Sequence, residues 1–192
     1  FFQDGVVHPL THTLDLAYGC FCTAAIATEI GDTTVAAQMF EYASQWENAF
    51  DKNGVLRDST YYEGSKYNYS FRLLHDMASR ISLAGGDTAF VDLLDTFFGY
   101  AADSVPAPGV SPCRAEMAEG ELLGRFEGFN NEPDMESPYA YIYAGRHDRA
   151  CEVIRAGLTQ CYGDSRGGLV GNDDSGGMSS WYVWSALGLF PV

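Results

Sequence analysis

The sequence predicts an all-α fold built from helix hairpins, and three features of its 192 residues support this. Apolar residues recur at steps of three and four, which is the spacing of one helical face. No comparable run alternates apolar and polar residues with β-branched enrichment, as a half-buried strand would. Short glycine-containing turns alternate with long loops, as expected for paired helices that carry their loops at one end.

Most helices are predicted from a series of apolar residues at these steps, and the others from a capping residue just before the helix. The series run from Leu10 to Ala24, Val35 to Trp46, Leu74 to Ala84, Phe90 to Phe97 and Cys151 to Cys161. The predicted helices span residues 11–30, 33–49, 67–84, 87–99, 137–144, 148–162 and 178–188.

The connections between these helices fall into two kinds. Short turns contain glycine, which helix C-termini favour, and the first two lead into an Asp or Thr cap. In an up-down array the long connections all emerge at one end, where loops commonly carry a functional site. The short turns are Gly31-Asp32, Gly85-Gly86 and residues 145–147, and the long loops are residues 50–66, 100–136 and 163–177.

Each long loop places acidic residues just before a helix. The first contains Glu63, the second contains Glu132 and Asp134, and the third contains Asp173 and Asp174. Helix N-termini favour carboxylates, so any one acid can be a helix cap: Asp174 or Ser175 for the last helix, and Asp134 or Ser137 for the helix at 137–144. Because three loops share this feature at one end, we expect the acids to converge in a functional site.

Carboxylates from separate loops suit two compatible chemistries. A pair can cleave a glycoside, one group protonating the leaving oxygen and the other activating water. Oxygen ligands from Glu, Asp and Asn can also bind Ca²⁺. Nearby aromatic residues suit sugar rings but equally suit a core, and for Trp184 and Phe190 we expect the core; the others are Tyr61, Tyr62, Tyr67, Trp181 and Tyr182.

Composition excludes several other classes of protein. With 26 acidic and 11 basic residues the net charge is −15, which disfavours nucleic acid. No apolar run reaches the roughly 20 residues of a membrane helix, and no phosphate-binding glycine motif is present. The first residues lack a basic start, so we expect no signal peptide in this fragment. Five cysteines form an odd set, and we expect them to be small buried hydrophobic residues.

Three blocks of the sequence resemble a known family. The stretch from Gly171 to Val192, GNDDSGGMSSWYVWSALGLFPV, closely resembles the signature of glycoside hydrolase family 92. Two further blocks agree with that family in order and spacing. They are Tyr62-Glu63-Gly64 followed by Tyr69 and His75-Asp76, and Asn131-Glu132-Pro133 followed by Pro138-Tyr139 and Tyr143-Ala144-Gly145.

The resemblance implies part of an (α/α)₆ toroid and a calcium-dependent, inverting exo-α-mannosidase. Glu63 matches the general acid, and Asp174 matches the base, with Asp173 assisting. Glu132, with Asn131 beside it, matches a Ca²⁺ ligand. For contact with a mannose-containing glycan we predict His75, Asp76, Trp181 and Tyr182. The resemblance also implies a secreted or periplasmic protein.

The chain departs from the family pattern in places. Ser65-Lys66-Tyr67-Asn68 replaces the family's Asn-x-Trp-Gln, and Asn130 replaces a glycine. Residues 1–192 match only the later part of one catalytic domain, so we expect a fragment that lacks the N-terminal β-sandwich and remaining helices and is inactive alone. Three alternatives stay open: a non-catalytic calcium- or sugar-binding module, a purely structural helical fragment whose acids are caps, and an (α/α)₆ inverting glycosidase for another sugar.

Overall fold

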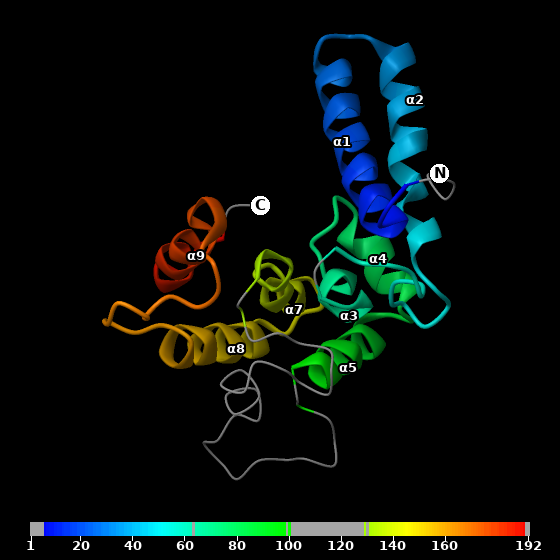
Figure 1. Cartoon of the computed structure of the whole chain (residues 1–192). Coiled ribbons are helices and arrows are strands. Elements are labelled where there is room, and N and C mark those ends of the chain that lie inside the picture. Colours follow the sequence, from blue (N-terminus) through cyan, green and yellow to red (C-terminus); the bar gives the residue numbers. More distant parts are fainter. Residues whose placement is uncertain (1–5, 63, 99, 101–128, 130, 191–192) are drawn as a thin grey trace.

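The computed structural model describes residues 6–62, 64–98, 100, 129 and 131–190. Within these ranges the chain is helical, and β-pairing is limited to one antiparallel bridge between Phe50 and Leu56, which confirms the all-α prediction. No helix in these ranges combines the length and apolarity needed to cross a bilayer. The α-helices (Figure 1) are α1 Pro9–Glu29, α2 Thr33–Ala43, α3 Lys66–Ser70, α4 Met77–Leu83, α5 Asp87–Phe97, α7 Ala140–Tyr143, α8 His147–Gln160 and α9 Gly177–Ala186. The 3₁₀ turns are η1 Ser44–Ala49, η3 Glu132–Asp134, η4 Ser137–Tyr139 and η5 Asp174–Gly176.

The first hairpin consists of α1 and α2, which lie side by side and project from the rest of the molecule (Figure 1). Pro9 occupies the first turn of α1, where its missing N–H removes no helical bond. Gly31 has a φ of 81°, a left-handed conformation in which glycine ends a helix without steric cost. The Asp32 side chain then accepts a hydrogen bond from the Val35 amide (3.1 Å) and caps α2. The predicted turn is confirmed.

The other two short turns also follow the sequence prediction. Gly85 and Gly86 have φ values of 100° and 97°, and Gly145 has a φ of 75°. The cap expected before α5 is wrong, because Gly86 occupies the N-cap position and no side chain caps the helix. Asp87 is instead the first helical residue, where its charge complements the helix dipole.

The single helix predicted over 67–84 is wrong, since two short helices, α3 and α4, replace it. The chain between them uses its backbone and side chains for tertiary bonds. The Leu73 amide donates to Glu136 Oε2 (3.1 Å), and Asp76 accepts from the Ser79 amide (3.0 Å) to start α4. These bonds compete with continuous helical pairing, and apolar spacing alone does not reveal them.

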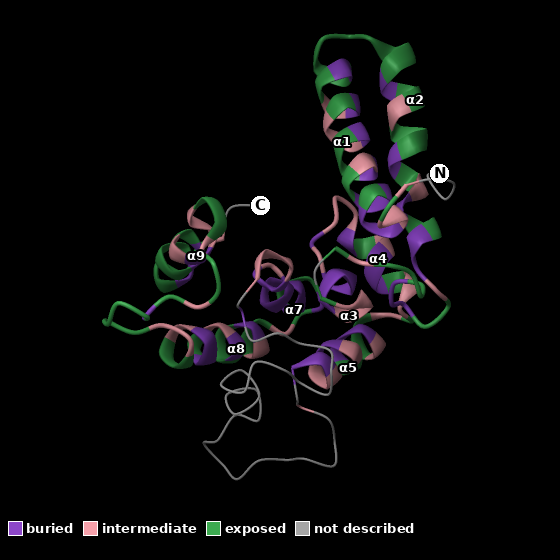
Figure 2. Ribbon diagram, viewed as in Figure 1, coloured by how far each residue is buried: buried purple, intermediate pink, exposed green. Residues whose placement is uncertain are grey.

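Two clusters of buried side chains form the core. Figure 2 marks the buried residues along the ribbon. The smaller cluster packs α1 against η1 and includes Leu14, Trp46 and Leu56. The larger cluster joins α4, α5, α7, α8 and α9, and includes Phe90 and Trp181. Burial of this apolar surface supplies the main driving force that holds the short helices together.

Arg80 on α4 connects the two clusters. Its guanidinium lies over the rings of Phe50 (4.2 Å) and Phe90 (5.1 Å) and donates to the carbonyl oxygens of Gly54 (2.6 Å) and Ser70 (3.0 Å). Burial lowers the pKa of Arg80 to about 10. The group therefore remains charged at neutral pH, and the rings and carbonyls compensate part of the lost hydration.

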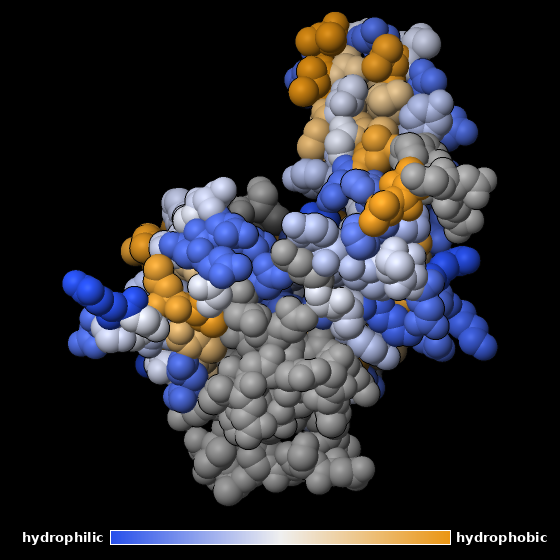
Figure 3. Space-filling view, in the orientation of Figure 1, coloured by the Kyte–Doolittle hydropathy of each residue, from blue (hydrophilic) through white to orange (hydrophobic). Residues whose placement is uncertain are grey.

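Some residues expected in the core are exposed instead. Cys151 is exposed on α8, whereas Cys20 is buried and Cys161 is half-buried; Cys113 lies outside the described residues. Trp184 is 40% exposed, while Phe190 stacks on Tyr139 with ring centroids 4.1 Å apart, as expected. Apolar side chains also remain exposed along α9 and over the outer end of the α1–α2 hairpin (Figure 3).

Two glycine-to-alanine changes test the packing around α8. Alanine normally stabilises a helix interior relative to glycine, by about 0.5–1 kcal/mol. At Gly157, however, a Cβ would lie 2.9 Å from the buried ring of Phe129 and 3.0 Å from that of Trp181. Gly157→Ala should therefore destabilise the fold by about 1–3 kcal/mol through overpacking, measured by chemical unfolding of the full-length protein.

Gly19→Ala in α1 is the matched control, because nothing lies within 4 Å of the Cβ that it adds. It should leave stability unchanged or raise it by about 0.5–1 kcal/mol. A stabilising effect at both positions would contradict the packing of α8 against Phe129 and Trp181.

Candidate active site

The segment 131–137 lies at the centre of the candidate site and is held by partners from two directions. Glu136 accepts from Arg72 Nε (3.1 Å), and Asp134 accepts from Asn68 Nδ2 (3.0 Å). From the other side, Trp181 Nε1 donates to the carbonyl oxygen of Met135 (2.7 Å). Bonds from the 68–72 region and from α9 therefore fix this short segment, which has few helical bonds of its own.

Glu132 reaches the N-terminus of α9. A Cβ built on Gly177, the first residue of α9, would lie 3.2 Å from Glu132 Oε1, so the carboxylate lies against the start of that helix. Oε1 is buried and has no hydrogen-bond partner among the described residues. The positive end of the helix dipole favours the charge at this position. A cation bound beside Oε1 would satisfy the remaining bonding capacity of the carboxylate.

Asn131 precedes Glu132 in an extended conformation. Its Oδ1 accepts a hydrogen bond from the Glu132 amide (3.1 Å) and so orients the start of η3. Asn131 and Glu132 present oxygen atoms, which hard cations such as Ca²⁺ prefer. The described residues contain no group of three or more His, Cys, Asp or Glu side chains with metal-site geometry. A cation here would therefore use carbonyl or amide oxygens, or substrate hydroxyl groups, beside Glu132.

Asp173 holds the same helix end from the third loop. Its Oδ1 accepts from the Ser179 amide (2.8 Å) and its Oδ2 accepts from the Ser179 hydroxyl (2.6 Å). These two bonds lower the pKa of Asp173, because they stabilise its charged form. The expected cap, Asp174 or Ser175, is wrong: Gly176 occupies the N-cap position, and Asp173 supplies the bond to the third helical amide.

Asp174 is placed differently from its neighbour. It begins η5, is exposed, and makes no side-chain hydrogen bond to another described residue. Asp173 and Ser175 on either side of it have φ values of 53° and 55°, which is uncommon for residues other than glycine. This backbone conformation separates the two carboxylates: Asp173 is bonded to α9, and Asp174 is exposed to solvent.

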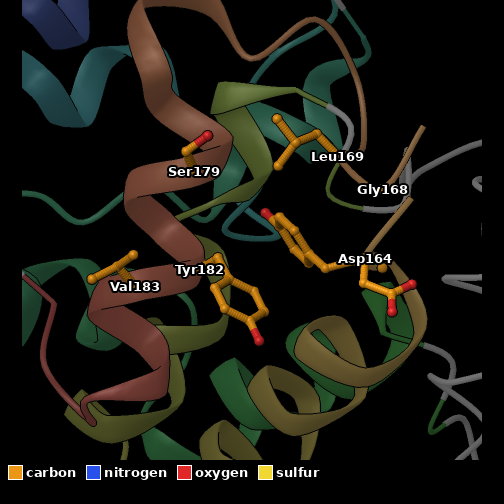
Figure 4. Close-up of a pocket in the computed structure, with 8 residues that line it drawn as sticks. Asp164, Gly168, Leu169, Ser179, Tyr182 and Val183 are labelled. Carbon is orange, nitrogen blue, oxygen red and sulfur yellow. The ribbon is translucent and has the colours of Figure 1, made fainter. Parts of the chain in front are cut away.

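Two cavities flank this region. One of about 340 Å³ is lined by Glu132, Glu136 and Arg72 together with Tyr18 of α1 and Phe190. The other, of about 470 Å³, runs along α9 (Figure 4), where Ser179 and Tyr182 face Asp164 and Leu169 of the preceding loop. Both lie beside acids of the site, and each offers aromatic and polar groups, as sugar-binding cavities do.

The predicted substrate-contact residues lie in three environments. Tyr182 is 43% exposed and lines the cavity along α9. Trp181 is 2% exposed, and its ring packs against Phe129 and Tyr162, which favours the core alternative. The position of Trp181 nevertheless affects the site, because its indole N–H holds Met135.

His75 contacts α1, and Asp76 is the N-cap of α4. His75 stacks on Phe21 of α1 at 4.7 Å, and burial lowers its pKa. Asp76 caps α4, and the hydrogen bonds from Ser79 lower its pKa. Among the described residues, no hydrogen bond or ring contact joins either side chain to segment 131–137 or to α9. Their predicted role in substrate contact remains a prediction.

Glu63, the predicted general acid, lies outside the described residues, as does Asn130. Ser65 caps α3, and its amide and hydroxyl both donate to Asn68 Oδ1. The contribution of Asn68 could not be found from sequence, since its partner Asp134 is 66 residues away.

Comparison with known proteins assigns the chain to a family. The profile of the glycosyl hydrolase family 92 catalytic domain matches residues 3–192. The chain belongs to glycoside hydrolase family 92. An uncharacterized secreted glycosidase of Arthroderma benhamiae is 32% identical over 130 residues, which cover 68% of this chain and 14% of that protein.

Solved family 92 structures have the same fold. A family GH92 alpha-mannosidase and a family GH92 inverting mannosidase, both from Bacteroides thetaiotaomicron, superpose with TM-scores of 0.74 at 24% identity. The aligned regions cover 95% and 94% of this chain, but only 24% and 28% of those proteins. The helices described above therefore form part of the (α/α)₆ toroid of family 92, and the chain spans about a quarter of the length of these relatives.

The Asp173–Ser179 contact predicts a specific pH dependence. Because the Asp173 pKa is lower in the folded than in the unfolded state, its bonds stabilise the fold above the ordinary Asp value of 3.8. This contribution is lost as the pH falls through the folded-state pKa. Ser179→Ala removes one bond, so the variant should have a lower Tm than the wild type at pH 7, and the difference should shrink below the ordinary Asp pKa.

Ser180→Ala is the matched control, since Ser180 is exposed on the neighbouring position of α9. It should leave Tm nearly unchanged across the same pH range. A Ser179→Ala effect that stays constant from neutral to acidic pH would show that the ionised Asp173 is not responsible.

Proposed function

We propose that the full-length protein hydrolyses terminal α-linked mannose in glycans, with inversion at the anomeric carbon and with the help of Ca²⁺. The family 92 match carries this proposal, because it covers residues 3–192 and includes the segments that contain all the predicted acids. A second observation supports it: Glu132 and Asp173, which are 41 positions apart in the sequence and belong to different loops, both lie at the N-terminus of α9.

The two carboxyl groups of an inverting reaction have different tasks. Asp174 acts as the general base, since an exposed carboxylate with no side-chain hydrogen bond to another described residue is available to bind and activate a water molecule. Asp173 assists by fixing the backbone beside it through Ser179. Glu63 acts as the general acid and donates a proton to the leaving oxygen. Inversion requires roughly 6.5–9.5 Å between the carboxyl groups of Glu63 and Asp174, which leaves space for the water.

Glu132 and Asn131 are the residues that would hold Ca²⁺. The buried Glu132 Oε1 has no hydrogen-bond partner among the residues that the structure describes, and this supports the role, because a bound cation would stabilise the buried negative charge. Bound Ca²⁺ would supply an electrophilic centre for sugar hydroxyl groups and help to distort the ring. The protein contributes the orientation: Asn131 fixes the start of η3, and Trp181 fixes the Met135 carbonyl.

The remaining assignments follow from the same proposal. Tyr182 contacts the sugar from the cavity along α9. Contact of His75, Asp76 and Trp181 with the substrate is part of the same proposal. Exposed apolar residues of α9 and its C-cap, such as Val183 and Leu187, pack against other parts of the same polypeptide. Secretion is supported by the Arthroderma benhamiae relative, which is described as a secreted glycosidase.

The stereochemistry and the base assignment can be tested together. In full-length protein, proton NMR during hydrolysis of an α-mannoside should detect β-mannose as the first product. Asp174→Asn should lower kcat by about 10²–10⁴-fold, because it removes the general base. Asp92→Asn, an exposed acid on α5, is the control and should retain activity. Initial release of α-mannose would contradict inversion, and full activity of Asp174→Asn would exclude it as the base.

The role of Ca²⁺ predicts a response to chelation. Thorough chelation should abolish α-mannoside hydrolysis, and added Ca²⁺ should restore it. Glu132→Gln should weaken Ca²⁺ binding in calorimetry, because a neutral amide replaces the charged ligand. Glu152→Gln, an exposed change on α8, should not. Activity that survives chelation would refute the metal role and leave Glu132 as a charge stabilised by α9 alone.

A further inference from the structure

Asn68 is a buried amide whose two polar atoms bind to different parts of the chain. Its Oδ1 accepts from the Ser65 amide (2.7 Å) and the Ser65 hydroxyl (2.8 Å). Its Nδ2 donates to Asp134 Oδ1 (3.0 Å). Asn68 is 1% exposed and Asp134 is 0% exposed. Because each end of the planar amide has a fixed partner, the orientation of the side chain is determined.

This arrangement fixes two segments relative to each other. Charge-assisted bonds to a carboxylate are shorter and stronger than neutral ones, and a buried carboxylate that loses its donor is costly. The Asn68–Asp134 bond therefore resists separation of α3 from η3. Arg72 makes a second connection nearby, since its guanidinium binds both Glu136 and Asp15. The region 65–72 is thus attached to segment 131–137 at two points.

Both anchored residues lie two positions after a predicted site acid. Ser65 follows Glu63 by two residues, and Asp134 follows Glu132 by two residues. Two residues of extended chain span at most about 7 Å. Anchoring Ser65 and Asp134 to the same amide therefore limits the separation of the two chain segments that carry Glu63 and Glu132.

We propose that Asn68 is a positioning residue that sets the general-acid loop against the Glu132 segment. The inference rests on the proposed glycosidase function, in which Glu63 donates the proton. Asn68 does not touch the substrate; it acts through Ser65 and Asp134. If the anchor is broken, the acid is displaced from the leaving oxygen, while the base Asp174 in η5 and the sugar-binding Tyr182 on α9 remain in place.

Displacement of an acid has a recognisable kinetic signature. A sugar leaving group needs protonation as its bond breaks, whereas a dinitrophenolate departs without it. Loss of correct acid placement should therefore lower turnover of a mannobiose and spare turnover of dinitrophenyl α-mannoside. A general loss of folded protein lowers both rates by the same factor. The ratio of the two kcat values, measured on one preparation, is independent of the amount of folded enzyme.

The experiment compares four forms of the full-length protein: wild type, Asn68→Asp, Asp134→Asn, and the double variant with both changes. Asn68→Asp places two carboxylates in contact, so their repulsion should separate the segments. The double variant restores one amide and one carboxylate with the direction of the bond reversed, and the introduced carboxylate can still accept from Ser65. Asp134→Asn alone keeps an acceptor for the Asn68 amide.

We expect Asn68→Asp to lower kcat for the mannobiose by about 100-fold, as for a catalytic group displaced by about 1 Å, with KM changed little. Turnover of dinitrophenyl α-mannoside should fall far less. The double variant should recover the wild-type ratio of the two rates, and Asp134→Asn should stay close to it. If Asn68→Asp yields no folded protein, Asn68→Ala serves instead, because it removes the anchor without adding charge.

Two results would overturn the inference. One is an equal loss on both substrates, and the other is failure of the double variant to recover the ratio. Tyr141→Phe is the control, because it removes a buried hydrogen bond elsewhere in the fold, from the Tyr141 hydroxyl to Asp95 (2.8 Å). It should leave the ratio unchanged. A wild-type protein that cleaves neither mannoside would refute the proposed function, whereas an active wild type with an unselective Asn68→Asp variant would refute only the role of Asn68.

Discussion

The candidate site depends on the need to satisfy the polar groups of segment 131–137 inside the protein. The short 3₁₀ turns η3 and η4, which lie within this segment and at its end, provide few backbone hydrogen bonds. The buried polar groups of the segment therefore require partners from other parts of the chain. Asn68 and Arg72 supply them from one side, and Trp181 supplies one from α9. The short helices α3, α7 and α9 are individually too short to be stable, and these bonds fix how they meet.

Apolar spacing predicts the helices whose stability comes from one buried face. The predicted ranges for α1, α5 and α8 lie within two residues of the observed bounds at each end. The same spacing fails over 67–84, because Glu136 and Asp76 take backbone amides that a continuous helix would use. It also misplaces Cys151, since periodicity identifies an apolar face but not whether another element covers it.

The predicted acids precede helices in long loops, and two of them, Glu132 and Asp173, lie at the N-terminus of α9. Their individual environments could not be predicted from the sequence. Asp173 rather than Asp174 holds α9, since the left-handed backbone at Asp173 and Ser175 decides which carboxylate reaches Ser179. Asn68 is also hidden at the sequence level, because its amide matters only once α3 and η3 are packed together.

The burial of Asn68 has a consequence for the making of this protein. Asn68-Tyr69-Ser70 has the form of an N-glycosylation acceptor. In the folded chain both polar atoms of the amide are occupied and the residue is inaccessible. A eukaryotic secretory host, however, attaches glycans to the emerging chain before it folds. A sugar attached to Asn68 before folding would therefore prevent α3 from docking on η3, because the amide could no longer bind Ser65 and Asp134.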